Sequence, residues 1–282
     1  MRSRFGAVTT LLTLAALALA GCGADEEPAA GGSSASPEQT PSSSPPTAAP
    51  WQPLTGPLSR CGPQPAAAAD AGFVPTTLED EEVGRISAVT AGSGPTVAIL
   101  LHQTDGNGAC GWLPYAAQLV AEPGVQVLAI DLCGYGESEC TGDRSSGPAQ
   151  VDAVAVAVRE ARTRMKAARV VVVGASMGGS VALMAAASPV EVDAVADLSG
   201  PVDWDGMEVV DGGRALRVPV LVAMADGEGE DQVAGARAIV DAAPQGSRFE
   251  PAESGHGYDL LLDRADQPTP LGSAVLGWVR GE

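Results

Sequence analysis

The chain has 282 residues, and its 35 acidic and 16 basic side chains give a formal net charge of −19 at pH 7. This negative excess argues against nucleic acid as a partner and against direct attraction to anionic lipid headgroups, because both carry negative charge. The length beyond the first 60 residues fits one domain with a sizeable core.

The first residues have the pattern of a secretory signal, with two arginines, an uncharged apolar run and small residues before Cys22. The run is too short for a membrane-spanning helix that has its own cytoplasmic flank. Leu19 to Cys22 resembles a bacterial lipobox, in which the cysteine receives a diacylglyceryl group and becomes the new N-terminus. We therefore predict a signal peptide over residues 1–21 and a lipid anchor at Cys22, which place the protein outside the cell membrane. An ordinary signal peptide with a chance cysteine is the alternative.

Residues 22–60 are dense in Pro, Ser, Gly and Ala. Such a segment cannot bury enough apolar surface to offset the entropy of ordering, so we predict a disordered tether after the lipidated cysteine. The folded domain is then expected over residues 61–282.

Four cysteines follow Cys22, and an even number in an exported domain suggests disulfides. The short spacing of Cys133 and Cys140 makes them the simplest pair, which leaves Cys61 with Cys110. The other two connectivities remain open. Because the chain has no Cys-x-x-Cys motif and no Cys/His cluster, we expect no metal site.

After Cys61, short apolar runs alternate with longer Ala-rich amphipathic segments. The runs predict buried strands at residues 96–102, 125–132, 169–175, 192–199 and 218–225. Continuous apolar strands are typical of a parallel sheet covered on both faces. The amphipathic segments predict helices at residues 111–122, 148–168, 178–188 and 231–243.

Three further segments complete the expected fold. Residues 81–92 predict an antiparallel edge strand, 247–253 the last strand, and 258–281 a closing helical segment interrupted near Pro268 and Pro270. The repeated order of strand, helix and strand implies right-handed crossovers. We therefore predict an α/β fold with a doubly wound, mostly parallel sheet and helices on both faces.

Ligands of such sheets bind at the carboxyl ends of the strands. Residues 174–178, GASMG, match G-x-S-x-G at such an end, where four valines stop and a helix-compatible segment begins. This is the setting of a nucleophile elbow, so Ser176 is the predicted nucleophile. Gly174, Gly178 and Gly179 would let the strand and the helix approach closely. Alternatively, Ser176 is only a small residue at a close packing contact.

A serine hydroxyl needs a base, and the chain has only two histidines, His102 and His256. His256 lies in a glycine-flanked turn after the last predicted strand and is the predicted base, with a surface loop histidine as the alternative. Asp226 directly follows an apolar run and is the predicted acid that orients His256. The competing acids are Asp197, Glu228, Glu230 and Asp231.

The order Ser176, Asp226, His256 is that of the α/β-hydrolases, and residues 83–280 resemble this family in its minimal, dienelactone-hydrolase-like form. The resemblance implies an oxyanion hole formed by the backbone N–H groups of Met177 and Thr104, with Gln103 as the alternative to Thr104. Gln103 stands where the family usually has glycine.

The resemblance also implies roles for residues outside the chemistry. His102 is expected to support the oxyanion loop, and Asp131 to be structural, in a turn where Cys133 takes a position often held by arginine. Only a short segment separates residues 199 and 218, so no large cap domain is expected. The pocket walls would then come from short loops that carry aromatic residues, although each of these could be ordinary packing: Trp112, Tyr115, Tyr135, Trp204 and Tyr258.

These features predict a cell-surface serine hydrolase that cleaves an ester or related acyl bond of a small molecule. No cofactor is needed, the lipid is the expected contact with the membrane, and the protein is expected to be a monomer. Alternatives on the same fold are a peptidase, a thioesterase and a haloperoxidase-like enzyme. A lipoprotein that uses the fold only for binding or envelope attachment is the alternative outside enzymes.

Overall fold

The structure is a computed structural model that describes residues 50–105, 107–210 and 212–282. The predicted signal peptide, the lipidation site Cys22 and most of the tether lie outside the described residues. Within these ranges, no helix combines the length and the apolar character needed to cross a bilayer.

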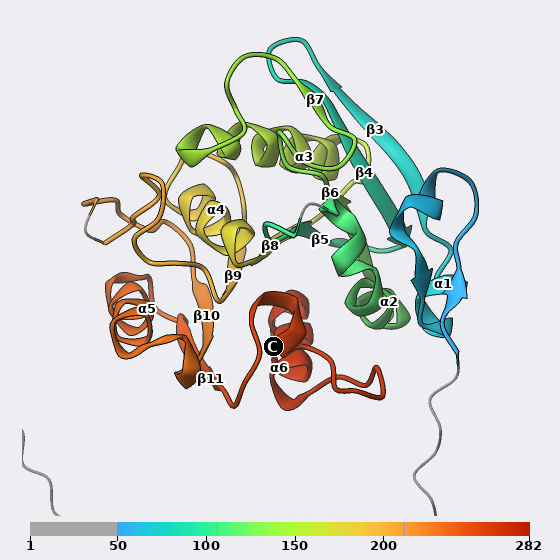
Figure 1. Ribbon diagram of the computed structural model, residues 1–282. Helices are drawn as coiled ribbons and strands as arrows, with labels where there is room; N and C mark the ends of the chain where they lie inside the picture. The colour runs from blue at the N-terminus through green and yellow to red at the C-terminus, as the bar shows by residue number, and fades with distance from the viewer. Residues whose placement is uncertain (1–49, 106, 211) are drawn as a thin grey trace, which may run out of the picture. The chain divides into compact units, whose positions relative to one another are not determined.

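The described domain is built on a nine-stranded sheet with the order β11-β10-β9-β8-β5-β6-β4-β3, and β7 pairs with β4 (Figure 1). The strands are β3 (Val74–Asp80), β4 (Gly84–Gly92), β5 (Thr96–Leu101), β6 (Val125–Ile130), β7 (Glu139–Cys140), β8 (Arg169–Ala175), β9 (Ala194–Leu198), β10 (Val220–Ala225) and β11 (Arg248–Ala252). The six strands from β11 to β6 along this order are parallel, as the continuous apolar runs predicted.

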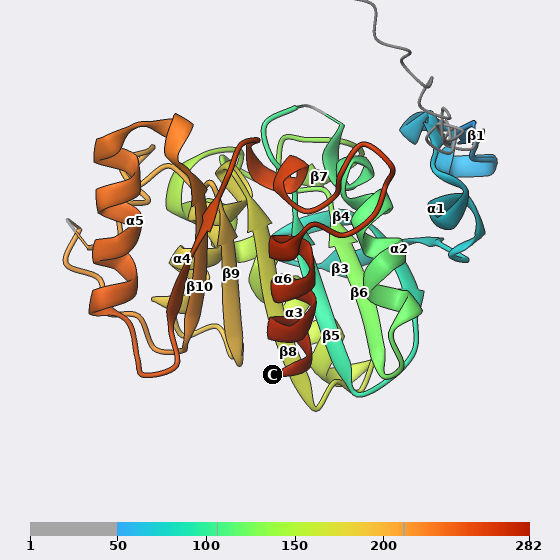
Figure 2. The same cartoon turned by 90° about the horizontal axis from the view of Figure 1, so that it is seen from below.

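Helices cover both faces of the sheet. One face packs against α3 (Val151–Thr163), α4 (Met177–Ala186) and α5 (Glu230–Ala242). The other packs against α1 (Ala66–Asp70), α2 (Leu113–Ala121) and α6 (Pro270–Arg280), of which α2 and α6 lie in front of the sheet in Figure 2.

The central strand β5 shows why its sequence is apolar without a break. Val97 and Ile99 pack on the α3 and α4 side, whereas Ala98 and Leu100 pack on the α2 and α6 side. Because successive side chains of a strand point to opposite faces, a strand covered on both faces must be apolar at every position.

The expected edge strand at residues 81–92 is not at the edge. It corresponds to β4, which pairs with β3 on one side and with β6 on the other. The true edge strand, β3, was missed because its sequence VPTTLED has only one buried residue, Leu78, and no apolar run. Pro75 fits an edge strand, where one side of the backbone has no partner.

The folded domain begins before the predicted boundary at residue 61. Gln52–Pro53 (β1) pairs with Pro63–Gln64 (β2), and the 3-10 helix η1 spans Gly56–Cys61. The prediction of a disordered tether is therefore wrong for these last residues. A single buried side chain, Leu58, and a disulfide anchor a segment whose Pro-rich composition indicates disorder. Both predicted disulfides, Cys61–Cys110 and Cys133–Cys140, are present.

The closing segment is interrupted as predicted. A 3-10 helix, η5 (Gly257–Leu260), is followed by a loop and then by α6, which begins at Pro270. Thr269 caps α6, since its hydroxyl accepts a hydrogen bond from the Gly272 N–H at 2.9 Å. Between β9 and β10 the described residues contain no helix, and no large cap domain is present.

Candidate active site

Ser176 lies in the one-residue turn that joins β8 to α4. Its backbone has φ 50° and ψ −119°, a left-handed φ that is uncommon for a residue with a side chain. The Ser176 N–H donates to Leu198 O at 2.8 Å, and its carbonyl accepts from Gly179 N–H at 2.7 Å. The neighbouring strand and the first turn of α4 thus hold the serine in this conformation, as expected for a nucleophile elbow.

The three predicted glycines make the close approach possible. A Cβ atom on Gly174 would overlap Gly178 O, one on Gly178 would overlap Leu101 O, and one on Gly179 would overlap Asp197 Oδ1. For Gly174 and Gly178 the overlapped atom belongs to the backbone, which cannot move aside as the end of a flexible side chain can.

Gly174→Ala is therefore expected to lower the free energy of unfolding by about 3 kcal/mol. Urea unfolding followed by tryptophan fluorescence measures it. The matched control is Gly227→Ala, because a Cβ on Gly227 has no atom within 4 Å; we expect a change of at most about 0.5 kcal/mol there. Equal unfolding midpoints for the two variants would contradict the close contact.

His256 follows β11 and directly precedes η5, in a turn that packs against the serine elbow. A Cβ atom on Gly257 would lie 3.2 Å from the Cβ of Ala175, the residue before Ser176. The structure thus brings the two predicted residues, Ser176 and His256, into one region through their chain neighbours. The His256 side chain is 47% exposed, so solvent reaches the imidazole.

The acid beside His256 is Glu228, not the predicted Asp226. His256 Nδ1 lies 2.9 Å from Glu228 Oε2, and the Glu228 side chain is only 15% exposed. Asp226 is exposed and opens the 3-10 helix η4 (Asp226–Glu228). The turn of η4 carries residue 228 back over the end of β10, where its Oε1 accepts the Ala225 N–H at 3.2 Å. The strand-end rule pointed to this segment, and within it the carboxylate that contacts His256 is two residues beyond the predicted one.

Ser199 fixes the other side of the Glu228 carboxylate. Its hydroxyl donates to Glu228 Oε1 at 2.6 Å, and its own backbone has φ 62°. Ser199 directly follows β9, so three strand ends contribute to one group: Ser199 from β9, Glu228 from β10 and His256 from β11.

The two predicted oxyanion donors come from different elements. Met177 is the first residue of α4, and N–H groups in the first turn of a helix have no partner within the helix. Thr104 is exposed in the segment after β5. Gln103, in place of the glycine usual in the family, packs its side chain against the His256 turn, where a Cβ on Gly257 would overlap Gln103 Oε1.

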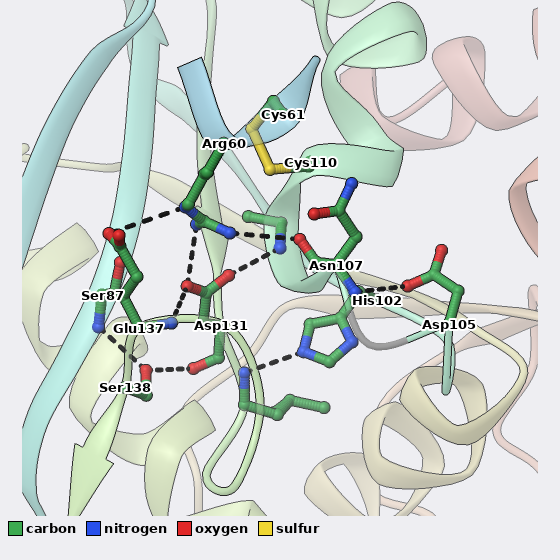
Figure 3. Close-up of polar contacts among 12 residues, drawn as sticks. Arg60, Cys61, Ser87, His102, Asp105, Asn107, Cys110, Asp131, Glu137 and Ser138 are labelled. Atoms are coloured by element: carbon green, nitrogen blue, oxygen red, sulfur yellow. Dashed lines mark hydrogen bonds and ion pairs between the residues drawn. A yellow bond between two sulfur atoms is a disulfide. The ribbon is translucent and has the colours of Figure 1, made fainter. Parts of the chain in front are cut away.

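His102 supports the segment after β5, in agreement with the expectation from the family. The imidazole is completely buried, and its Nε2 accepts the Leu132 N–H at 3.0 Å (Figure 3). Its Nδ1–H donates to Gln103 O at 2.7 Å. Burial lowers the pKa of His102, so the ring stays neutral and keeps both hydrogen bonds.

Asp131 is completely buried and joins three segments (Figure 3). Its Oδ1 accepts the Ala109 N–H at 2.7 Å, and its Oδ2 accepts the Glu137 N–H at 2.9 Å and Arg60 Nη2 at 2.8 Å. The predicted structural role of Asp131 agrees with these contacts. The arginine that pairs with it was not predicted.

Comparison with protein families identifies the fold family. The family model of the alpha/beta hydrolase fold matches residues 98–256, which is more than half of the chain. The chain belongs to the α/β-hydrolase fold family. The matched part of this α/β-hydrolase contains Ser176, Glu228 and His256 but not Arg60. A search of curated protein sequences found no match.

Solved structures with the same fold include several hydrolases. An esterase from Pyrococcus furiosus is 16% identical with a TM-score of 0.55, and the match covers 65% of this chain and 84% of that one. A dienelactone hydrolase from Anabaena variabilis is 18% identical, with a TM-score of 0.56 and coverage of 74% and 97%. The thioesterase domain from the curacin biosynthetic pathway is 14% identical, with a TM-score of 0.56 and coverage of 75% and 100%. At these identities the likeness shows the fold alone.

A cavity of about 460 Å³ lies beside the His256 turn of this α/β-hydrolase. Tyr258 and Asp259 line it together with Asn107 and Trp51. Of the predicted wall aromatics, Trp112 and Tyr115 are buried core residues, although Tyr115 also borders this cavity. Tyr135 packs edge-on against His102, with 5.0 Å between the ring centroids, and Trp204 is partly buried against the core on the α3, α4 and α5 side of the sheet. Within the described ranges, no cluster of three His, Cys, Asp or Glu side chains could hold a metal ion.

Asp197, one of the competing acids, is completely buried behind the elbow of this α/β-hydrolase. Its Oδ1 accepts the Gly200 N–H at 2.8 Å, whereas its Oδ2 has no hydrogen-bond partner. Burial, with a smaller contribution from the nearby Glu228 charge, raises the pKa of Asp197 to about 7. No hydrogen bond or ion pair joins it to His256, whereas Glu228 has one.

The raised pKa predicts how Asp197 affects stability. A folded-state pKa above the unfolded value means that the folded protein binds the extra proton, so its stabilising contribution is full below about pH 4 and is lost as the pH rises to about 7. Across this window we expect the wild type to lose up to about 1.4 kcal/mol per pH unit relative to Asp197→Asn. Urea unfolding between pH 4.5 and 7.5 measures the difference. Parallel pH curves for the two proteins would contradict it, and the exposed Asp226→Asn is the control.

Proposed function

We propose that the protein is a serine hydrolase that cleaves an ester or a related acyl bond. The observations that carry the proposal are the left-handed backbone of Ser176 at the turn from β8 to α4 and the His256 imidazole, which is held by a carboxylate and lies on a turn that packs against this elbow. Simple close packing explains the glycines of this turn, but it does not explain why a serine in a strained conformation and a histidine and acid pair lie on segments that contact each other.

In the proposed mechanism Ser176 Oγ attacks the acyl carbonyl carbon. Because His256 Nδ1–H is held by Glu228, Nε2 is the nitrogen that accepts the serine proton. The tetrahedral intermediate collapses, and His256 gives the proton to the leaving alkoxide, which departs as an alcohol. A water molecule then attacks the acyl-enzyme, with the same proton transfers, and releases the acid and free Ser176.

Two neighbouring groups support the charges that develop in these steps. The Glu228 carboxylate stabilises the imidazolium and keeps the ring in the required tautomer. Met177 N–H and Thr104 N–H are the proposed donors to the oxyanion, with Gln103 N–H as the alternative to Thr104. Hydrolysis by these steps uses no cofactor.

We also propose that the enzyme acts outside the cell, anchored to the membrane by a lipid on Cys22. The support is the lipobox-like end of the signal sequence and the presence of two disulfides, which persist in oxidising compartments. The proposed substrate is a small acyl compound. An esterase and a thioesterase domain share the fold, and both reactions use the same steps.

Fluorophosphonate labelling tests the proposal directly, since such probes react with an activated serine. The folded protein should be labelled, and peptide mass spectrometry should place the label on Ser176. Ser180 is the internal control, because it lies in the first turns of α4, the helix that follows Ser176, but its hydroxyl donates to Pro201 O at 3.0 Å. Absence of labelling in the folded protein would overturn the hydrolase proposal and favour a lipoprotein that only binds.

A further inference from the structure

We call residues 102–105 and 107–109, which follow β5, the oxyanion segment, because they include the proposed second oxyanion donor. This segment is held at both of its ends. At the first end, His102 and the Leu132 N–H fix its direction, as described above. At the second end, Arg60 Nη1 donates to Asn107 O at 3.2 Å, and the Ala109 N–H donates to Asp131 Oδ1 at 2.7 Å (Figure 3). The residues proposed to provide the second oxyanion donor, Gln103 and Thr104, lie between these two anchors.

Arg60 connects the second end of the oxyanion segment, at Asn107, to the buried carboxylate of Asp131. Its guanidinium donates a hydrogen bond to Asp131 Oδ2 at 2.8 Å and another to the Asn107 carbonyl oxygen. One planar group therefore contacts both Asp131 and Asn107. The Arg60 side chain is 19% exposed and Asp131 is 0% exposed. Within the described residues, no other cation forms a salt bridge with Asp131. Removal of the guanidinium would leave a buried carboxylate without its charge partner.

Arg60 belongs to η1, a segment outside the part of the chain that matches the family model. The neighbouring Cys61 is bonded to Cys110 of η2 (Gly108–Trp112), which continues from the oxyanion segment. The disulfide therefore fixes the arginine to the segment that it orders. The Arg60 hydrogen bond to Asn107 O and the Cys61–Cys110 disulfide thus reach the chain within four residues of each other, from Asn107 to Cys110.

Resting on the proposed function, we infer that the N-terminal segment of residues 56–61 is part of the catalytic apparatus, with Arg60 as a positioning residue for the oxyanion segment. Arg60 and the Cys61–Cys110 disulfide hold residues 103–105 where an N–H can meet the developing oxyanion. The effect should fall on kcat rather than on KM, because the charge on the substrate oxygen exists only in the transition state.

The test compares Arg60→Ala with Arg162→Ala. Arg162 is a matched control, since its side chain is 26% exposed and it bonds Asp193 Oδ2 at 2.6 Å and the Ala168 carbonyl at 3.0 Å. Kinetics on an aryl ester, corrected for the folded fraction, should show kcat lowered about 10- to 100-fold in Arg60→Ala with KM within about 2-fold. Arg162→Ala should keep the wild-type kcat, and Arg60→Lys should be intermediate because an ammonium cannot replace the fork.

The double variant Cys61→Ser with Cys110→Ser should lower kcat in the same direction. Hydrogen exchange provides a readout that does not depend on activity: amides in residues 103–105 and 107–109 should exchange faster in Arg60→Ala and at the wild-type rate in Arg162→Ala. Wild-type kcat, or wild-type exchange, in folded Arg60→Ala would overturn the inference while leaving the hydrolase proposal intact. If the wild type cleaves no ester, the proposed function fails, and the exchange result alone decides whether Arg60 orders this segment.

Discussion

Ser176→Ala is expected to lower kcat for an aryl ester by about 10⁴-fold or more. The substitution removes the attacking oxygen but leaves the oxyanion donors and the substrate contacts in place, so KM should change little. Alanine adds no atom to a side chain that is 8% exposed, and the fold should be retained. Steady-state kinetics of the purified variant, with circular dichroism to confirm the fold, measures the effect.

Ser180→Ala is the matched control for this loss. Ser180 is buried on α4, the helix that follows Ser176, and donates one hydrogen bond, to Pro201 O. Its removal should cost about 1 kcal/mol of stability and leave kcat within a few-fold of the wild type. Equal rates for Ser176→Ala and the wild type would assign the hydrolysis to another group.

The elements that could be predicted from the sequence are those whose pattern of apolar and polar residues reflects their burial. The parallel strands are covered on both faces, so the continuous apolar runs of β5, β8 and β10 are visible without a structure. The edge strand β3 and the segment η1 each bury one large side chain, Leu78 and Leu58, and are held mainly by pairing and by a disulfide. Strand pairing leaves no local pattern in the sequence, and the predicted Cys61–Cys110 disulfide did not by itself indicate that the residues before Cys61 are folded.

The residues of the candidate site also divide into those that a local sequence pattern predicts and those that it does not. Ser176 and His256 were predicted because each follows a strand at the carboxyl edge of the sheet, and Ser199 could have been found by the same rule. The choice between Asp226 and Glu228 depends on one turn of 3-10 helix, which composition does not specify. Arg60 had no signal at all, since it meets Asp131 from 71 positions earlier in the chain.

Glu228→Gln is expected to lower kcat by about 10³- to 10⁴-fold, because an amide at this position no longer stabilises the imidazolium and favours the wrong tautomer of His256. The glutamine has the same length and retains an oxygen that can accept from Ser199 or Ala225. The protein should therefore fold, and the loss would report chemistry rather than stability. Glu228→Asp should retain more activity, since it keeps the charge on a shorter side chain.

Asp226→Asn is the matched variant, two residues away in the same turn. Its carboxylate is exposed and does not meet His256, so kcat should stay within about 2-fold of the wild type. Measurement of kcat for Asp226→Asn and Glu228→Gln on the same ester distinguishes Asp226 from Glu228 as the acid that orients His256. A large loss in Asp226→Asn with little change in Glu228→Gln would restore the acid that the strand-end rule chose and would mean that η4 rearranges when substrate binds. The opposite pattern assigns the orienting role to a carboxylate that three strand ends hold in place through Ala225, Ser199 and His256.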